Sequence, residues 1–184
     1  MISGIKNTQI IMDNISGLPS ELPVVFNDSP TTSVAPTHIL ALSTPTCTKT
    51  NLILIHQLPF AVNCSSFPTL PKSSTATPVG NRSTTATLPV IRLSPPSVEA
   101  FHLFQMYLYV KDPEALRTAF LPTGWTDSID SIIQRAILIK GFWSNAFYFG
   151  TLDDHMFEII DECWADVLRT LNRATRYFSF VRQT

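Results

Sequence analysis

The chain has 184 residues, and 45% of them are hydrophobic, which is enough apolar material for a buried core. Charged residues make up only 15% and the formal net charge is −1, so composition gives no electrostatic reason to expect a nucleic acid or an anionic membrane as partner. Three scattered cysteines without a CxxC pair are typical of a reducing compartment. We find no signal segment and no apolar run of membrane-spanning length, so we expect a soluble, intracellular protein.

The first 37 residues show weak periodicity and contain several glycine and proline breakers, so we predict a poorly ordered arm over 1–37 and one domain over 38–180. Two apolar runs, HILALS (38–43) and LILIH (52–56), stand on either side of the polar segment TPTCTKTN. This pattern predicts a β-hairpin buried on both faces.

A segment rich in serine, threonine and proline follows at 65–87, and we predict a mobile loop there because it has few large apolar groups to bury. Thr77, which precedes Pro78, is a candidate site for proline-directed phosphorylation in this segment. Chance occurrence is the default explanation, given how common these residue types are here.

The chain then returns to strand character at Leu88–Leu93 (LPVIRL). Ser94 with Pro95 has the pattern of a helix start, with a capping side chain before a first-turn proline. Asp112 with Pro113 repeats this signal for a short helix that ends at Pro122.

The clearest helical period lies in 126–140, where one apolar stripe is predicted to be buried, with Gly141 as its C-terminal stop. The stripe consists of Ile129, Ile132, Ile133, Ala136 and Ile137. A short aromatic stretch over 142–149 follows. We predict a last helix capped by Thr151, with Asp153 and Asp154 in its first turn, where carboxylates suit the helix dipole.

No group of residues in the sequence forms a recognisable catalytic, cofactor-binding or metal site, so we predict a protein that is not an enzyme and holds no cofactor. A small hydrolase of unrecognised type stays as an alternative, and it would need a reactive Cys64 or Cys163. Asp153 and Asp154 could form an acid–base pair, but adjacent carboxylates at a helix start are more often dipole-compensating.

Candidate partner-binding residues are an aromatic side chain and a short row of cations. Trp125 follows Pro122 and Gly124 in a loop with no helical face to occupy. Arg169, Arg173 and Arg176 share one face of the last helix, although a solvated helix end explains them as well. We therefore do not expect direct nucleic-acid binding, because one side of a helix offers few phosphate contacts.

A strand, a helix and an aromatic end with Pro96, Phe101, Tyr107 and Tyr109 resemble the second half of a BTB/POZ domain. The chain also resembles the clampless-type proteins of basidiomycete fungi. The motifs that carry this resemblance are LPF (58–60), LPxIxL (88–93), the YLY…DPEAL…LP run (107–122) and GFW (141–143).

The resemblance implies an α+β, BTB/POZ-like fold, with a small sheet covered by about five helices. It also implies a non-catalytic regulator of clamp-cell formation and sexual development, with proteins such as homeodomain-type transcription factors as partners. A BTB-type adaptor of a cullin ubiquitin ligase is the first alternative. A BTB domain has two helices between its hairpin and the next strand, whereas this chain has the 65–87 segment, so a homodimer stays open without being favoured.

Overall fold

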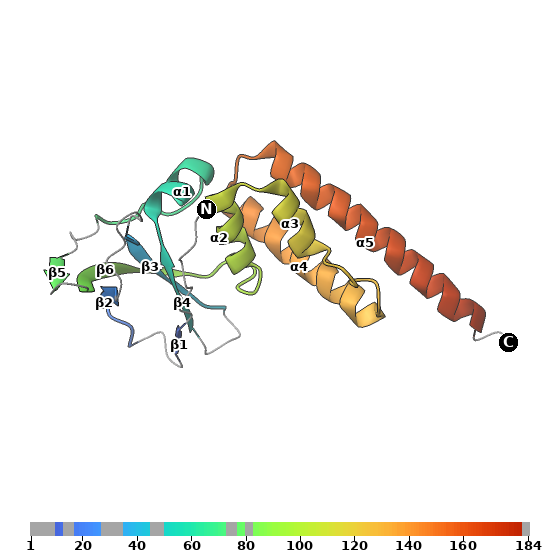
Figure 1. The fold of residues 1–184 in the computed structure, drawn as a ribbon, viewed down its shortest axis with the longest axis horizontal. Coiled ribbons are helices and arrows are strands. Elements are labelled where there is room, and N and C mark those ends of the chain that lie inside the picture. The colour runs from blue at the N-terminus through green and yellow to red at the C-terminus, as the bar shows by residue number, and fades with distance from the viewer. Residues whose placement is uncertain are drawn as a thin grey trace. The chain divides into compact units, whose positions relative to one another are not determined.

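The computed structural model describes residues 10–12, 17–26, 35–44, 50–72, 77–79 and 83–181. The chain is α+β, as predicted, and it divides into two compact units where the sequence suggested one domain over 38–180. The first unit comprises 1–62 and 67–98 and holds the strands, whereas the second comprises 63–66 and 99–184 and holds the long helices (Figure 1).

The strands form one sheet in the order β1-β4-β3-β6-β2, with β5 paired to β6. The elements are β1 (Ile10–Met12), β2 (Glu21–Phe26), β3 (His38–Leu42), β4 (Thr50–Ile55), β5 (Thr77–Val79) and β6 (Ser83–Leu93). Strands β3 and β4 are antiparallel, with Leu40 opposite Ile53, so the predicted hairpin is confirmed. Strand β6 runs parallel to β3, with Leu40 opposite Ile91.

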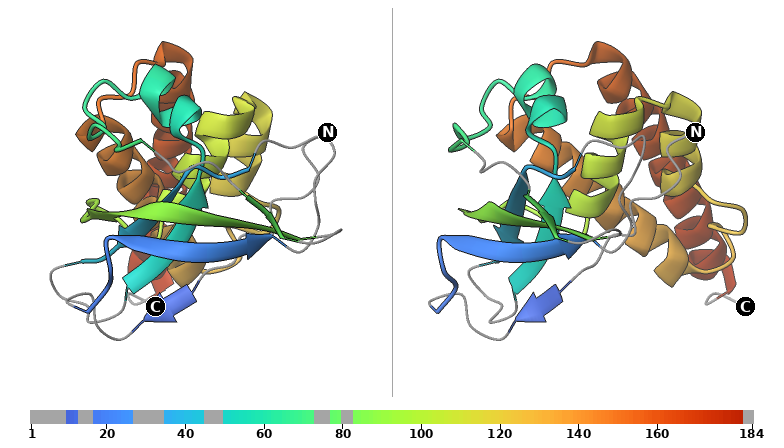
Figure 2. Two further views of the ribbon diagram at one scale, coloured as in Figure 1. Left: turned by 90° about the vertical axis from the view of Figure 1, so that its left-hand side faces the viewer. Right: turned by 60° about the vertical axis from the view of Figure 1, so that its left-hand side comes forward.

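Part of the predicted arm is a strand, because β2 pairs antiparallel with β6 along its whole length (Figure 2). Pro23 lies in the middle of β2 and obscured it in the sequence, but an edge strand tolerates a residue without an N–H. Leu18, also in the predicted arm, is 4% exposed. Strand β1 of the same predicted arm also pairs antiparallel with β4, so the arm prediction is corrected for the described residues 10–12 and 17–26.

The 65–87 segment also contains regular structure. Its residues include β5 and the first five residues of β6, which extends the predicted Leu88–Leu93 strand back to Ser83. Threonine is β-branched and favours strands, so the run STTAT can pair even though it has little to bury. A short helix that the sequence did not predict, α1 (Gln57–Asn63), precedes this segment and buries Phe60.

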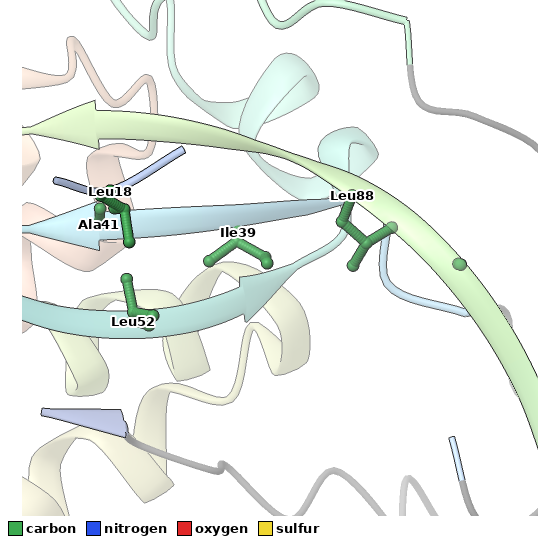
Figure 3. Close-up of a cluster of buried hydrophobic side chains, with 6 residues drawn as sticks. Leu18, Ile39, Ala41, Leu52 and Leu88 are labelled. Atoms are coloured by element: carbon green, nitrogen blue, oxygen red, sulfur yellow. The ribbon is translucent and has the colours of Figure 1, made fainter. Parts of the chain in front are cut away.

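One core cluster of the first unit lies on one face of the sheet, and Leu40 and Leu42, on the other side of β3, are fully buried as well. Ile39 and Ala41 alternate along β3, and Leu52 of β4 and Leu88 of β6 stand beside them (Figure 3). Leu18 and Ala86 complete the cluster. Side chains two apart on a strand share a face, which explains why alternate residues of β3 meet the same neighbours.

The second unit holds α2 (Phe101–Val110), α3 (Pro113–Phe120), α4 (Ile129–Tyr148) and α5 (Asp154–Val181). Asp112 caps α3 as predicted, since its side chain accepts a hydrogen bond of 3.0 Å from the Ala115 N–H. The predicted cap Ser94 is wrong, because α2 begins only at Phe101. Pro96 follows Pro95, and a proline disfavours the helical conformation of the residue before it. A helix therefore cannot easily start at Pro95.

Two further helix ends differ from the prediction. Gly141 does not end a helix but lies inside α4, where buried neighbours such as Ile139 and Phe142 offset the modest helical cost of glycine. The cap of α5 is Asp153 and not Thr151, because Asp153 Oδ1 accepts from the Met156 N–H at 3.0 Å. No helix among the described residues is long and apolar enough to cross a membrane.

Candidate interaction surface

A cluster of phenylalanine rings fixes the orientation of α4 in the second unit. Phe104 of α2 lies edge-on to Phe142 of α4 at 5.7 Å between ring centroids, and Phe120 of α3 meets the same ring at 5.1 Å. Phe104 also stacks on Phe149, just after α4. All four rings are fully buried. Because such rings contribute strongly to core stability, one face of α4 is firmly committed to the interior.

The other side of α4 presents large apolar side chains to solvent. Ile133 is 41% exposed, Ile137 57%, Trp143 44% and Phe147 72%. The rings of Trp143 and Phe147 stack on one another, 5.6 Å apart and inclined by 14°. We call these four residues the α4 outer face. A row of exposed apolar side chains is typical of interaction sites on soluble proteins.

The exposure of these side chains shows that the prediction of which α4 residues are buried was partly wrong. Ile132 is buried as predicted, at 2% exposure, but Ile133 and Ile137 point to solvent. The buried face is formed by Ile132, Ile139, Phe142, Asn145 and Ala146. The signal that could have revealed the outer face is the excess of apolar residues, since α4 has more of them than one buried stripe of a helix can hold.

A group of polar residues joins the end of α2 to the start of α5. Asp153 Oδ2 accepts hydrogen bonds from the Tyr107 hydroxyl at 3.1 Å and from Lys111 Nζ at 2.6 Å. Burial raises the pKa of the Asp153 carboxyl, but hydrogen bonds from Lys111, the Met156 N–H and Tyr107, with the charge of Lys111, outweigh it and lower the pKa overall. Burial and the Asp153 charge raise the pKa of Tyr107. Asp153 is therefore held ionised and Tyr107 neutral.

A second ion pair holds α3 against α5. Arg117 Nη2 donates to Glu162 Oε2, and this hydrogen bond raises the pKa of Arg117 and lowers that of Glu162. Both side chains are substantially exposed, so the pair is expected to add little to stability. The ring cluster, in contrast, packs directly against the inner side of α4 through Phe142.

The predicted partner-binding residues lie in separate places. Trp125 is half-buried in the loop between α3 and α4, where its backbone N–H donates to the Pro122 carbonyl. Arg169 and Arg173 are exposed on α5, and Arg169 Nη2 donates to Asp166 one turn earlier, so its charge is partly compensated within the helix. Arg176 lies in α5, but its side chain is outside the described residues.

Thr77 belongs to β5 in the first unit, and its side chain also lies outside the described residues. Its backbone pairs with Thr85 of β6. Thr77 therefore begins a paired strand and does not lie in an irregular loop, and its phosphorylation stays a prediction.

The two described cysteines are buried and unpaired with one another. Cys64 Sγ lies 3.8 Å from the Thr151 hydroxyl, and Cys163 is in the middle of α5. Burial raises the pKa of both thiols, more than the nearby positive charges of Lys111 and Arg117 lower it. In the described ranges, histidine, cysteine, aspartate and glutamate form no group of three that could hold a metal ion.

Two protein-family models match the chain. Residues 1–96 match the clampless protein 1 N-terminal domain, and residues 89–183 match the clampless protein 1 C-terminal domain. The chain therefore belongs to the clampless protein 1 family. The two matches overlap at residues 89–96, close to the division between the compact units after Val98. No curated protein and no solved structure matches the chain.

Proposed function

We propose that this protein is a non-catalytic protein–protein interaction module that regulates fungal sexual development, at the step of clamp-cell formation. Membership of the clampless family supports the developmental role. The observation that carries the interaction role is the α4 outer face, because its apolar side chains are exposed while the opposite side of the same helix is tightly packed. We place this activity inside the cell, with transcription regulators of homeodomain type as the partner class.

Complementation tests the proposal. A basidiomycete strain that lacks its own clampless gene should regain clamp cells with the wild-type chain and with Leu152→Glu, but not with Phe147→Glu. Leu152 is 80% exposed and lies outside the α4 outer face, so it controls for adding a charge to an exposed apolar site. Full complementation by Phe147→Glu would remove the interaction role from this face.

Affinity purification of the tagged full chain, with the same two variants, identifies the partner class. We expect transcription regulators with the wild-type chain and with Leu152→Glu, and their loss with Phe147→Glu. Recovery of metabolic enzymes alone, unchanged by Phe147→Glu, would contradict the proposed partners.

A BTB/POZ-like fold, and with it a cullin adaptor role, is our second candidate. It is favoured by the order of elements in the first unit, in which the β3–β4 hairpin is followed by a helix and then by β6. The single short helix α1 stands where a BTB domain has two. Co-purification of cullin subunits that survives Phe147→Glu would support this candidate, and their absence from every sample would reject it.

A further inference from the structure

We propose that the α4 outer face binds the same face of a second copy of the chain, with the two α4 helices antiparallel. This inference rests on the proposed use of that face for protein contacts and names its occupant. The proposal comes from the spacing of side chains along α4. Helix α4 follows β6, so this surface differs from the two helices between hairpin and next strand that help BTB domains to dimerise.

The exposed side of α4 has the spacing of a coiled-coil seam. The seam includes Ile133, Trp143 and Phe147 of the outer face, and Ile137 lies beside it. Its residues alternate four and three positions apart over almost the whole helix: Ile129, Ile133, Ala136, Lys140, Trp143 and Phe147. Ile129 and Ala136 are half-buried and the other four are exposed. A repeat of this kind keeps one side of a helix facing a partner helix, with each side chain inserted between those opposite. The fully buried residues of α4, such as Ile139 and Phe142, lie on its other side.

The seam is complementary to itself when the second helix runs antiparallel. With a twofold axis near residue 138, Ile129 faces Phe147, Ile133 faces Trp143 and Ala136 faces Lys140 of the other copy. Each of the two aromatic rings then meets an isoleucine, and the long lysine meets the smallest side chain in the seam. Its ammonium group can extend past Ala136 to solvent while its methylene chain covers apolar surface.

A parallel arrangement is disfavoured by the same residues. It would place Lys140 against Lys140 and Trp143 against Trp143 of the other copy, which brings like charges and two large rings together. One polar residue in a seam is known to select among such arrangements. Lys140 therefore favours the antiparallel register over its alternative.

The physical cost of pairing is small, because α4 is already ordered by the packing of its inner side. The surface is also small. A helix of 20 residues is about 30 Å long and about one helix diameter wide, which is at the low end for specific interfaces. We therefore expect a dimer that dissociates at about micromolar concentration.

Sedimentation velocity of the full chain from about 1 to about 200 µM tests the pairing. We expect the wild type to change from monomer to dimer over this range. Ile133→Glu and Phe147→Glu should stay monomeric at every concentration. Leu168→Glu and Leu152→Glu should dimerise like the wild type. The exposed fraction of Leu168, 42%, is nearly that of Ile133, 41%, but Leu168 lies on α5. Unchanged circular dichroism will show that each variant is folded.

Disulfide trapping tests the direction of the helices, with Cys47 replaced by serine in every variant. Near the twofold axis, Ile137→Cys should cross-link to itself. Phe147→Cys should not cross-link to itself, but should cross-link to Ile129→Cys when the two variants are mixed. Self-linking of Phe147→Cys would overturn the antiparallel arrangement.

A wild-type chain that stays monomeric at about 200 µM, or a dimer that ignores Ile133→Glu and Phe147→Glu, would overturn the proposal. These outcomes can be told apart from failure of the proposed function. If the wild type is monomeric but Phe147→Glu still fails to restore clamp cells, the face binds a partner other than a second copy, and the interaction role is kept. A dimer abolished by Phe147→Glu without any effect on clamp cells does the reverse.

Discussion

The hydroxyl of Tyr107 donates to the carboxylate of Asp153 at 3.1 Å, and this contact joins residues 46 positions apart in the chain. The same carboxylate caps α5 through its other oxygen and accepts from Lys111 Nζ. One ionised group thus fixes where α5 starts and how α2 lies against it. Since α5 packs against both α3 and α4, Asp153 indirectly supports the helix that carries the outer face.

The first prediction concerns pH. The folded pKa of Asp153 lies below its unfolded value, so its stabilising contribution is complete above about pH 4 and is lost as pH falls through the folded pKa. Asp153→Asn keeps a capping side chain but removes the charge, and it should cost about 1 kcal/mol near neutral pH, a value reduced for the partial exposure of Lys111. The measurement is urea unfolding at several pH values from about 7 to about 3.

The difference between the wild type and Asp153→Asn should shrink toward the acidic end of this series. Asp154→Asn serves as the control, because Asp154 is exposed and adjacent, and it should change stability by less than about 0.5 kcal/mol. A difference that is constant with pH would show that the charge of Asp153 has no part in the effect.

A second prediction concerns the turn between α4 and α5. Gly150 has φ +62, and a Cβ built there would lie 2.3 Å from the Ser65 hydroxyl oxygen. Gly150→Ala should therefore cost about 2 kcal/mol or more, from left-handed strain and from displacement of Ser65, whose N–H donates to the Gly150 carbonyl. Thermal and urea unfolding measure this change.

Gly17→Ala is the matched control for Gly150→Ala. A Cβ at Gly17 would meet nothing within 4 Å, so this variant should stay within about 0.5 kcal/mol of the wild type. Ser65→Ala in the Gly150→Ala background should restore part of the loss, because it removes the closest atom. Equal stability of the two glycine variants would contradict the strained turn.

Local signals in the sequence predicted local structure well. The buried hairpin followed from two nearly continuous apolar runs, and the start of α3 followed from Asp112 and Pro113, because a cap needs only residues within one turn. Ser94 carried the same signal and failed, since Pro96 restricts the residue before it. The difference between these two starts lies one residue beyond the motif.

What the sequence could not predict depended on contacts between distant residues. The strand β2 contains a proline and depends for its pairing on β6, whose paired residues run from Thr84, opposite Phe26, to Pro89, opposite Glu21. Periodicity showed that α4 has an apolar stripe, but not which of its apolar residues the rings of Phe104 and Phe120 would select for the core. The outer face is what that selection left exposed, which is why the sequence alone assigned Ile133 and Ile137 to the interior.

A third prediction compares two phenylalanines of α4. Phe142 is fully buried against Phe104, Tyr107 and Phe120, so Phe142→Ala should cost about 3–5 kcal/mol. Phe147 is 72% exposed, so Phe147→Ala should change stability by less than about 0.5 kcal/mol in the monomer. Urea unfolding at low protein concentration gives both values. A large loss for Phe147→Ala would mean that this ring is part of the fold and not of a free surface.

The last prediction concerns the thiols, on which the hydrolase alternative depends. The thiolate is the reactive form of cysteine, and burial raises the pKa of both Cys64 and Cys163 while also limiting access of a reagent. In the folded chain near neutral pH, both should react with a maleimide at least about 100-fold more slowly than in the urea-unfolded chain. Peptide mapping by mass spectrometry assigns each site and separates them from Cys47, which lies outside the described residues. Rapid labelling of Cys64 or Cys163 in the folded chain, with the other inert, would instead indicate an activated nucleophile and restore the hydrolase as a serious candidate.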